Sequence, residues 1–241
     1  MTGPGADARR RAVVVQHDEA VGLGNFEPVL REHGYEISVV SARAPGFAAA
    51  LDAASDADLL VVLGSTSGVY EADRHEFIAP EIAHLRVRLA AERPALGVCF
   101  GAQIIAAALG EEVRPGDTVD VGYREVQPTI EGHDSAVRHI VGVPVAEWHG
   151  DTFDLPTGVT LLASSEAYRN EAYGIGDWLL AVQFHPELTD EMHEEWVQGD
   201  AAYLARHDID ADGLRAQRAR YGGPMQLASA RMLGEYLSRL P

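Results

Sequence analysis

A strand is expected to turn into a helix within Leu96-Gly97-Val98-Cys99-Phe100-Gly101-Ala102-Gln103, a stretch that holds the only cysteine of the chain. Residues 95–98 are apolar and predict a short buried strand, and residues 103–109 predict a helix that stops at Gly110. Gly97 and Gly101 flank the cysteine at a distance of two residues, as a turn too tight for a Cβ requires. The pattern predicts a nucleophile elbow with Cys99 in a strained backbone conformation.

Two properties of such a turn favour a reactive cysteine. The positive end of the helix dipole stabilises a thiolate at the helix N-terminus. The backbone N–H of Phe100 can stabilise an oxyanion that forms beside the sulfur. A lone cysteine is more often a small buried apolar residue, so the functional interpretation of Cys99 depends on the rest of the site.

Composition limits the classes of protein and partner. The chain has 241 residues, of which 46% are apolar, and we expect one globular domain over residues 1–241 with a loose tail at 1–10. No apolar run approaches the roughly 18 residues of a membrane span. A formal charge of −18 argues against nucleic acid and membrane partners. The single cysteine, without an apolar leader in residues 1–11, indicates a cytoplasmic protein.

Apolar runs alternate with helical patterns in the first half of the chain. Strands are predicted at residues 12–16, 36–40, 58–64 and 95–98, and helices near 28–33 and over 78–92, with a short helical or irregular link at 51–57. This alternation is typical of an α/β fold with an open, mostly parallel, flavodoxin-like sheet and helices on both faces. The site of such a sheet lies beyond the carboxyl ends of its strands, where the loop 65–70 and the Cys99 turn both fall.

The pattern changes after Gly110. Segments punctuated by glycine and proline predict a small antiparallel region with strands at residues 112–113, 122–128, 140–143 and 159–164, and one more at 167–169. Residues 145–151 lead into a loop that ends at Leu155-Pro156. A strong strand is predicted at 178–184, followed by helices at 189–196, about 201–207 and 224–240.

The strand at residues 178–184 ends at His185-Pro186-Glu187, which contains the groups that a cysteine nucleophile needs. A thiol is only a few per cent ionised at neutral pH unless a base assists it. His185 and Glu187 lie two positions apart on an extended segment, so both side chains leave the same face and Glu187 can orient the imidazole. A His-x-Glu pair by itself is more often a surface pair, and its significance here comes from Cys99.

Two motifs together resemble the class I, triad-type glutamine amidotransferases: Gly97–Gln103 around the cysteine, and Gln183-Phe184-His185-Pro186-Glu187. The resemblance covers about residues 12–190 and is that of a free-standing domain similar to the glutaminase domain of GMP synthases. It implies that Cys99 attacks the side-chain amide of glutamine, that ammonia leaves with a proton from His185, and that His185 then activates the water that hydrolyses a γ-glutamyl thioester. It also implies that Glu187 orients His185 and that no cofactor takes part.

The resemblance extends to further segments with weaker assignments. Residues 148–156 are similar to the W-H-x-D…L-P stretch of the family, and Gly64–Tyr70 to its oxyanion-hole loop. The oxyanion hole would consist of the N–H of Phe100 and one from the Gly64-Ser65 turn. Gln103 would bind the glutamine, and Tyr123 is assigned to the substrate rim, with core packing as an equal alternative.

The oxyanion loop departs from the family pattern. Where many members have Gly-Gly-Pro, this chain has Gly64-Ser65-Thr66, which keeps the N–H of Ser65 but loses the Gly and Pro that shape the turn. One hypothesis is therefore that the hole forms only when substrate or a partner binds.

His149 and Asp151 form a second candidate pair. As metal ligands they would need a third partner, and the sequence shows no other metal-binding spacing, since His193-Glu194-Glu195 lacks the second histidine of H-E-x-x-H. A structural or loop-orienting role is favoured for both, and no metal is expected.

Three functions are compatible with these residues. The first is a glutaminase that supplies ammonia to a partner; since no synthetase domain or phosphate loop is recognised, a synthetase subunit would act in trans. The second is a free-standing hydrolase that cleaves another γ-glutamyl amide or peptide with the same triad. The third is a non-catalytic scaffold on this fold, which would have no need of Cys99, His185 and Glu187 together.

Overall fold

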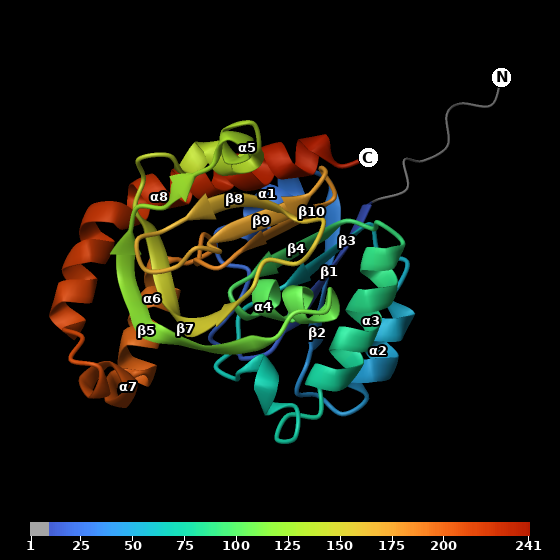
Figure 1. The fold of residues 1–241 in the computed structure, drawn as a ribbon, viewed down its shortest axis with the longest axis horizontal. Helices are drawn as coiled ribbons and strands as arrows, with labels where there is room; N and C mark the ends of the chain where they lie inside the picture. Colours follow the sequence, from blue (N-terminus) through green and yellow to red (C-terminus); the bar gives the residue numbers. More distant parts are fainter. Residues whose placement is uncertain (1–9) are drawn as a thin grey trace.

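A computed structural model describes residues 10–241 as an α/β structure around one large sheet (Figure 1). The strands are β1 (Arg10–Gln16), β2 (Tyr35–Ser41), β3 (Leu59–Val62), β4 (Ala95–Val98), β5 (Val113–Arg124), β6 (Gln127–Pro128), β7 (Val145–Phe153), β8 (Thr160–Ser164), β9 (Ala172–Ile175) and β10 (Leu179–Val182). The helices are α1 (Phe26–Glu32), α2 (Phe47–Ala53), α3 (Ile78–Ala90), α4 (Phe100–Ala108), α5 (Ile130–His133), α6 (Asp190–Gly199), α7 (Ala201–Arg206) and α8 (Ala211–Arg239). Short 3-10 helices occur at Val69–Glu71 and Ala136–Ile140.

The main sheet has the strand order β2-β1-β3-β4-β10-β9-β8-β6. The first five strands of that order run parallel, and β9, β8 and β6 continue the sheet with antiparallel pairing. Strands β5 and β7 form a separate antiparallel pair. The predicted open, mostly parallel sheet with a small antiparallel region is confirmed.

Helices cover both faces of the parallel strands, so each face has its own apolar core (Figure 1). On one face Val14 and Leu96 pack in a cluster with residues of α1 and α8. On the other, Val15 and Leu60 pack in a cluster with residues of α2, α3 and α4. Neighbouring strand residues point to opposite faces, which explains why these strands are apolar throughout and not alternating.

Two predicted strands are wrong. Residues 140–143 belong to the end of the 3-10 helix Ala136–Ile140 and the turn after it, because the buried Val137 and Ile140 pack against the α8 side of the core. Residues 167–169 form a bend in which Tyr168 and Ser165 exchange hydrogen bonds, and the next strand starts only at Ala172.

Two elements are longer than predicted. The segment after residue 145 continues as β7 to Phe153, because it pairs along its length with β5. Helix α8 begins at Ala211, not at 224, with the Asp210 carboxylate capping its first turn, and it runs through Pro224. A proline inside a helix costs about 3 kcal/mol, and the burial of residues on both sides of it, Leu214 and Met225 among them, offsets that cost.

The amino-terminal tail predicted at residues 1–10 lies almost entirely outside the described residues, and Arg10 is the first residue of β1. Within residues 10–241, no helix combines the length and the apolar character needed to cross a membrane.

The turn between β4 and α4 depends on the two glycines that flank Cys99. A Cβ on Gly101 would lie 2.0 Å from the backbone oxygen of Val62 in β3, and one on Gly97 would lie 2.8 Å from the backbone of Gly101. The start of α4 therefore packs directly on the backbone of β3 and β4, and the turn leaves no room for a Cβ at either glycine, as the sequence predicts. Gly110 ends the helix with a φ of 109°, a conformation that favours glycine.

We expect Gly101→Ala to destabilise the protein by at least about 2 kcal/mol, because the added methyl group meets fixed backbone. Gly234→Ala is the matched control: it also lies in a helix, its Cβ would meet only His33 at 3.5 Å, and alanine favours the helix by up to about 1 kcal/mol. Denaturant unfolding of both variants tests this. Equal stabilities would contradict the close approach of α4 to β3.

Candidate active site

Three neighbouring strands of the sheet bring the predicted catalytic residues together. Gly64 follows β3, Cys99 follows β4 and His185 follows β10, and these strands are adjacent and parallel. A Cβ on Gly64 would lie 3.1 Å from His185 Cε1 and 3.7 Å from Cys99 Cβ. The expected convergence at the carboxyl ends of the strands is thus present in the structure.

Cys99 has a backbone conformation that only a tightly held residue adopts. Its φ is 52° and its ψ is −108°, a strained region for a residue with a side chain, which costs on the order of 1–3 kcal/mol. The surrounding backbone holds it: the Cys99 N–H donates to Val182 of β10 (2.8 Å), and its carbonyl accepts from Gln103 in α4 (3.1 Å). The thiol is thereby aimed into a cavity from the N-terminus of α4.

His185 is held between Glu187 and Cys99. Its Nδ1 lies 2.7 Å from Glu187 Oε1, and both side chains are buried. A carboxylate can only accept at neutral pH, so Nδ1 carries the proton and Nε2 is left for the sulfur. The ring also packs edge-on against Trp196 of α6, with ring centroids 4.7 Å apart.

The charges around His185 favour its protonated form. Burial by itself would lower the pKa of His185, but the negative charges of Glu187 and Cys99, together with hydrogen bonds from the ring to both, raise that pKa well above its ordinary value. A histidine held beside a thiol in this way can exchange a proton with it, as a cysteine nucleophile requires.

The oxyanion loop is held by a carboxylate that sequence reasoning missed. Asp18 Oδ2 accepts hydrogen bonds from the Thr66 N–H (2.9 Å) and the Ser65 hydroxyl (3.1 Å). Arg43 pairs with Asp18 Oδ1 (2.9 Å) and donates to the Ser67 hydroxyl (3.1 Å). Partial burial by itself would raise the pKa of Asp18. The hydrogen bond from the Thr66 N–H and the charge of Arg43 outweigh this effect, so the pKa is lowered overall and the negative charge of Asp18 is stabilised.

These contacts hold residues 65–67, in the loop that lacks the Gly and Pro of the family pattern. That the oxyanion hole forms only when substrate or a partner binds stays a prediction. The contacts of Asp18 and Arg43 come from segments remote in sequence, and no motif in the sequence could have pointed to them.

The two predicted substrate residues have different surroundings. Gln103 is buried, lines the cavity beside Cys99, and donates from Nε2 to Gln183 Oε1 (3.2 Å). Tyr123 is not among the residues that line the cavity: it is buried in the core, where its hydroxyl accepts from Arg218 of α8 (3.1 Å). Its position corresponds to the core-packing alternative.

The cavity has a volume of about 910 Å³ and extends well beyond the thiol. Beyond Cys99 and the oxyanion loop, its walls come from residues 115–119 of β5, residues 148–151 of β7, and helices α6 and α7. None of the described lining residues is lysine or arginine. Five of them are acidic: Glu71, Asp117, Asp151, Glu195 and Asp200.

The second candidate pair does not act through its two side chains together. The Asp151 carboxylate faces the cavity and accepts from the Tyr70 hydroxyl (3.3 Å). The His149 ring meets Asp151 through its backbone oxygen and not through its carboxylate. Its Nε2 faces Glu147 and Glu171. These three side chains form a group that could hold a metal ion, which the spacing of residues in the sequence does not indicate.

The sequence profile described as glutamine amidotransferase class-I matches residues 12–200. The chain is 29% identical over 215 residues to the glutamine amidotransferase-like protein YfeJ of Salmonella typhimurium, covering 87% of each. It is 32% identical over 133 residues to a GMP synthase of Porphyromonas gingivalis, covering 54% of this chain and 24% of that one. It is 32% identical over 108 residues to γ-glutamyl peptidase 3 of Arabidopsis thaliana, covering 42% of this chain and 43% of the peptidase.

A solved structure of a glutamine amidotransferase has a similar fold. The crystal structure of a glutamine amidotransferase from Thermotoga maritima superposes with a TM-score of 0.82 at 26% sequence identity, covering 96% of this chain and 99% of that chain. The match of the profile spans the elbow, the oxyanion loop and the His185–Glu187 segment alike. The chain therefore belongs to the class-I glutamine amidotransferase family.

Proposed function

We propose that this protein hydrolyses the side-chain amide of glutamine in the cytoplasm, through a γ-glutamyl thioester on Cys99, and supplies the ammonia to a partner. The observation that carries the proposal is the buried relay of Cys99, His185 and Glu187, in which His185 Nδ1 lies 2.7 Å from Glu187 Oε1 and the ring lies beside Cys99 at the ends of adjacent strands. A non-catalytic scaffold would not require two buried ionisable groups behind a strained cysteine. We further propose that residues 1–241 act as a single amidotransferase domain.

The geometry suggests how the bonds change. The Cys99 thiolate attacks the amide carbon, and the N–H groups of Phe100 and Ser65 donate hydrogen bonds to the oxyanion that forms. His185 donates its proton to the departing nitrogen, so the C–N bond breaks and ammonia leaves. His185 then removes a proton from water, which attacks the thioester and breaks the C–S bond. Glutamate leaves, and the proton held by His185 restores the ion pair.

A partner is part of this proposal because the matched region is only a small share of the GMP synthase relative. The match covers 24% of that synthase, so the rest of its length has no counterpart in the aligned part of this chain. We propose that a synthetase subunit receives the ammonia in trans.

The cavity favours a second candidate, a hydrolase of γ-glutamyl amides with a larger, positively charged leaving group. A volume of about 910 Å³ lies at the upper end of the range for small-molecule sites and exceeds what glutamine alone needs. Asp117 and Glu195 are exposed carboxylates on its wall, and no described lining residue offers a compensating lysine or arginine. Such a wall attracts cations and repels anions. The similarity to a γ-glutamyl peptidase is consistent with this candidate.

Release of the leaving group from a panel of γ-glutamyl amides tests both candidates. Wild-type protein should release ammonia from glutamine, or an amine from γ-glutamyl amides, and Cys99→Ala should release neither. The panel compares glutamine with γ-glutamyl amides of a diamine, of a neutral alkylamine of equal length and of an amino acid.

A preference for glutamine supports the ammonia-supplying function, whereas a preference for the diamine amide supports the second candidate. Undiminished release by Cys99→Ala, or failure of wild type on the whole panel, would overturn the thioester mechanism.

We expect Glu187→Gln to lower the pKa of His185, because the substitution removes the carboxylate charge that raises it. Turnover of the best panel substrate should fall roughly 10²–10⁴-fold, as when an acid–base residue is compromised. NMR titration of the His185 ring measures the pKa directly. Glu235→Gln is the matched control. Glu235 also pairs with a histidine, His139 (Nε2 to Oε2, 2.6 Å), but neither residue lines the cavity. An unchanged His185 titration in Glu187→Gln would contradict the proposed relay.

Asp18→Ala should loosen the oxyanion loop and lower kcat roughly ten- to hundredfold, less than the loss of a whole oxyanion donor. KM should change less than kcat, because the loop acts mainly on the charged intermediate. Asp56→Ala serves as the control, since Asp56 is an exposed carboxylate that pairs with Arg11. Steady-state kinetics of both variants provide the measurement, and equal kcat values would refute the role of Asp18.

A further inference from the structure

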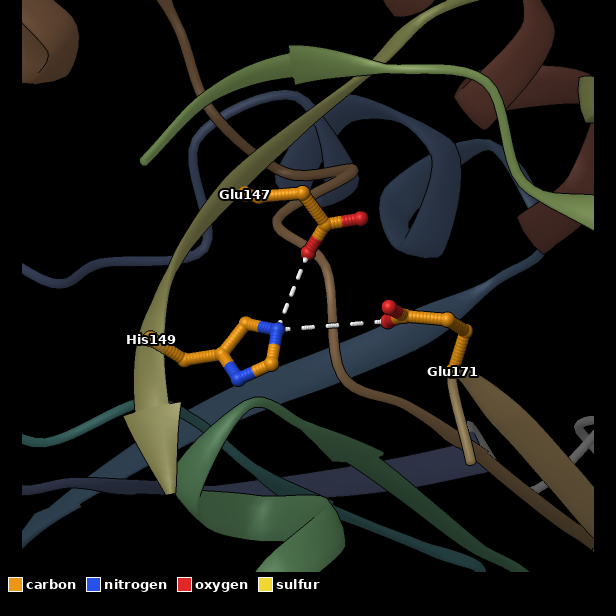
Figure 2. A group of neighbouring side chains, drawn as sticks. All are labelled: Glu147, His149 and Glu171. Atoms are coloured by element: carbon orange, nitrogen blue, oxygen red, sulfur yellow. Dashed lines mark ion pairs between the residues drawn. The ribbon is translucent and has the colours of Figure 1, made fainter. Parts of the chain in front are cut away.

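A second group of titratable side chains consists of Glu147, His149 and Glu171 (Figure 2), of which His149 lines the cavity. Glu147 and His149 project from the same face of β7, and Glu171 directly precedes β9. His149 Nε2 lies 3.3 Å from Glu147 Oε2 and 4.0 Å from Glu171 Oε2. One ligand atom from each residue can be chosen so that all lie within 4.8 Å of one another.

Four polar atoms of this group are buried and lack hydrogen-bond partners within the part of the chain that the structure describes. Glu147 and Glu171 are fully buried, and His149 is 5% exposed. These atoms are both carboxylate oxygens of Glu147, Nε2 of His149 and Oε2 of Glu171, none of which has a hydrogen-bond partner among residues 10–241. An unpartnered buried polar atom costs about 1–3 kcal/mol, and more when it is charged, so four of them in contact call for an additional ligand.

His149 presents a lone pair to the two carboxylates. Its Nδ1 lies 3.2 Å from the backbone oxygen of Asp151, which can only accept, so the ring proton resides on Nδ1. Nε2 is then an acceptor that faces carboxylate oxygens, and this contact is repulsive unless a positive charge lies between them. Metal-binding histidines commonly have this arrangement, with the other ring nitrogen donating to a backbone carbonyl.

The charges of the group point to the same kind of ligand. Two carboxylates and the acceptor nitrogen of His149 lie within 4.8 Å of one another and are buried. A divalent cation would compensate two carboxylate charges that burial otherwise disfavours.

We propose that Glu147, His149 and Glu171 bind one divalent transition-metal ion of the Zn²⁺ or Mn²⁺ type. One imidazole and two carboxylates suit these ions, whereas Ca²⁺ and Mg²⁺ prefer oxygen alone, and the group contains no sulfur for a softer metal. Ligands at about 2.0–2.1 Å around a tetrahedral ion lie roughly 3.3 Å apart, which is the separation of Glu147 Oε2 and His149 Nε2. Glu171 completes the set after a small rotation, and the Ser165 hydroxyl holds its other oxygen (2.6 Å).

The site is adjacent to the catalytic residues without being part of them. Ala146, next to Glu147 in β7, accepts a hydrogen bond from the backbone N–H of His185 (2.7 Å). A metal ion that joins β7 to the start of β9 would fix the position of β7, the strand to which the His185 backbone is hydrogen-bonded. It would also fix the cavity wall at His149. Its role is therefore structural, and it does not depend on the identity of the substrate.

Calorimetric titration with Zn²⁺ and with Mn²⁺ tests the proposal. The titration uses Cys99→Ala protein, so that the thiol cannot bind the metal. We expect one ion per chain, and roughly a hundredfold or greater loss of affinity when Glu147→Gln and Glu171→Gln are added. The control adds Glu125→Gln and Glu131→Gln, which remove the same charge from two exposed glutamates.

Thermal unfolding provides a second readout. Glutamine has the shape of glutamate and relieves a buried charge, so the Glu147→Gln, Glu171→Gln protein should fold without metal at least as stably as its parent. Zn²⁺ should raise the Tm of the parent and the control but not of this variant. If the double variant does not fold, Glu171→Gln alone replaces it. Absence of stoichiometric binding to the parent, or equal binding by parent and variant, would overturn the proposal. Protonation would then neutralise the two glutamates in place of a metal ion.

Discussion

The close packing of helix α4 on the backbone of β3 and β4 is the constraint on which the active site depends. Gly101 allows the helix to start in contact with Val62, and Gly97 allows the chain to turn back on itself. With the helix held there, Cys99 is forced into a conformation with positive φ, and Cys99 lines the cavity. Neither glycine takes part in chemistry, yet the position of the thiol follows from both.

The parallel sheet provides the second half of the site. Because β10 lies next to β4 and runs in the same direction, the residue that follows it meets the residue that follows β4. His185 thus reaches Cys99 across a large separation in sequence, and Glu187 reaches His185 through the extended His185-Pro186-Glu187 segment. Burial increases the strength of both contacts, since the same charges in water would be screened.

Acidic residues have three different surroundings in this protein. Asp18 is stabilised by Arg43 and a backbone N–H, so its charge can shape the oxyanion loop. Carboxylates such as Asp117 on the cavity wall are exposed and act on what enters. Glu147 and Glu171 are buried, and burial raises the pKa of each. Net charge alone could not distinguish these cases, because each depends on what surrounds the carboxylate.

The amino-acid sequence by itself determined the parallel half of the fold, the elbow and the residues of the relay, because these depend on local patterns: apolar runs, paired glycines, and His-x-Glu on an extended segment. It did not determine the course of residues 140–143 or the start of α8, where packing outweighed local propensity. The contacts of Asp18 with the loop, the acidic cavity wall, and the meeting of His149 with Glu171 were decided only by the tertiary structure. Each joins side chains from separate segments, and their distances are set by how the strands are ordered in the sheets.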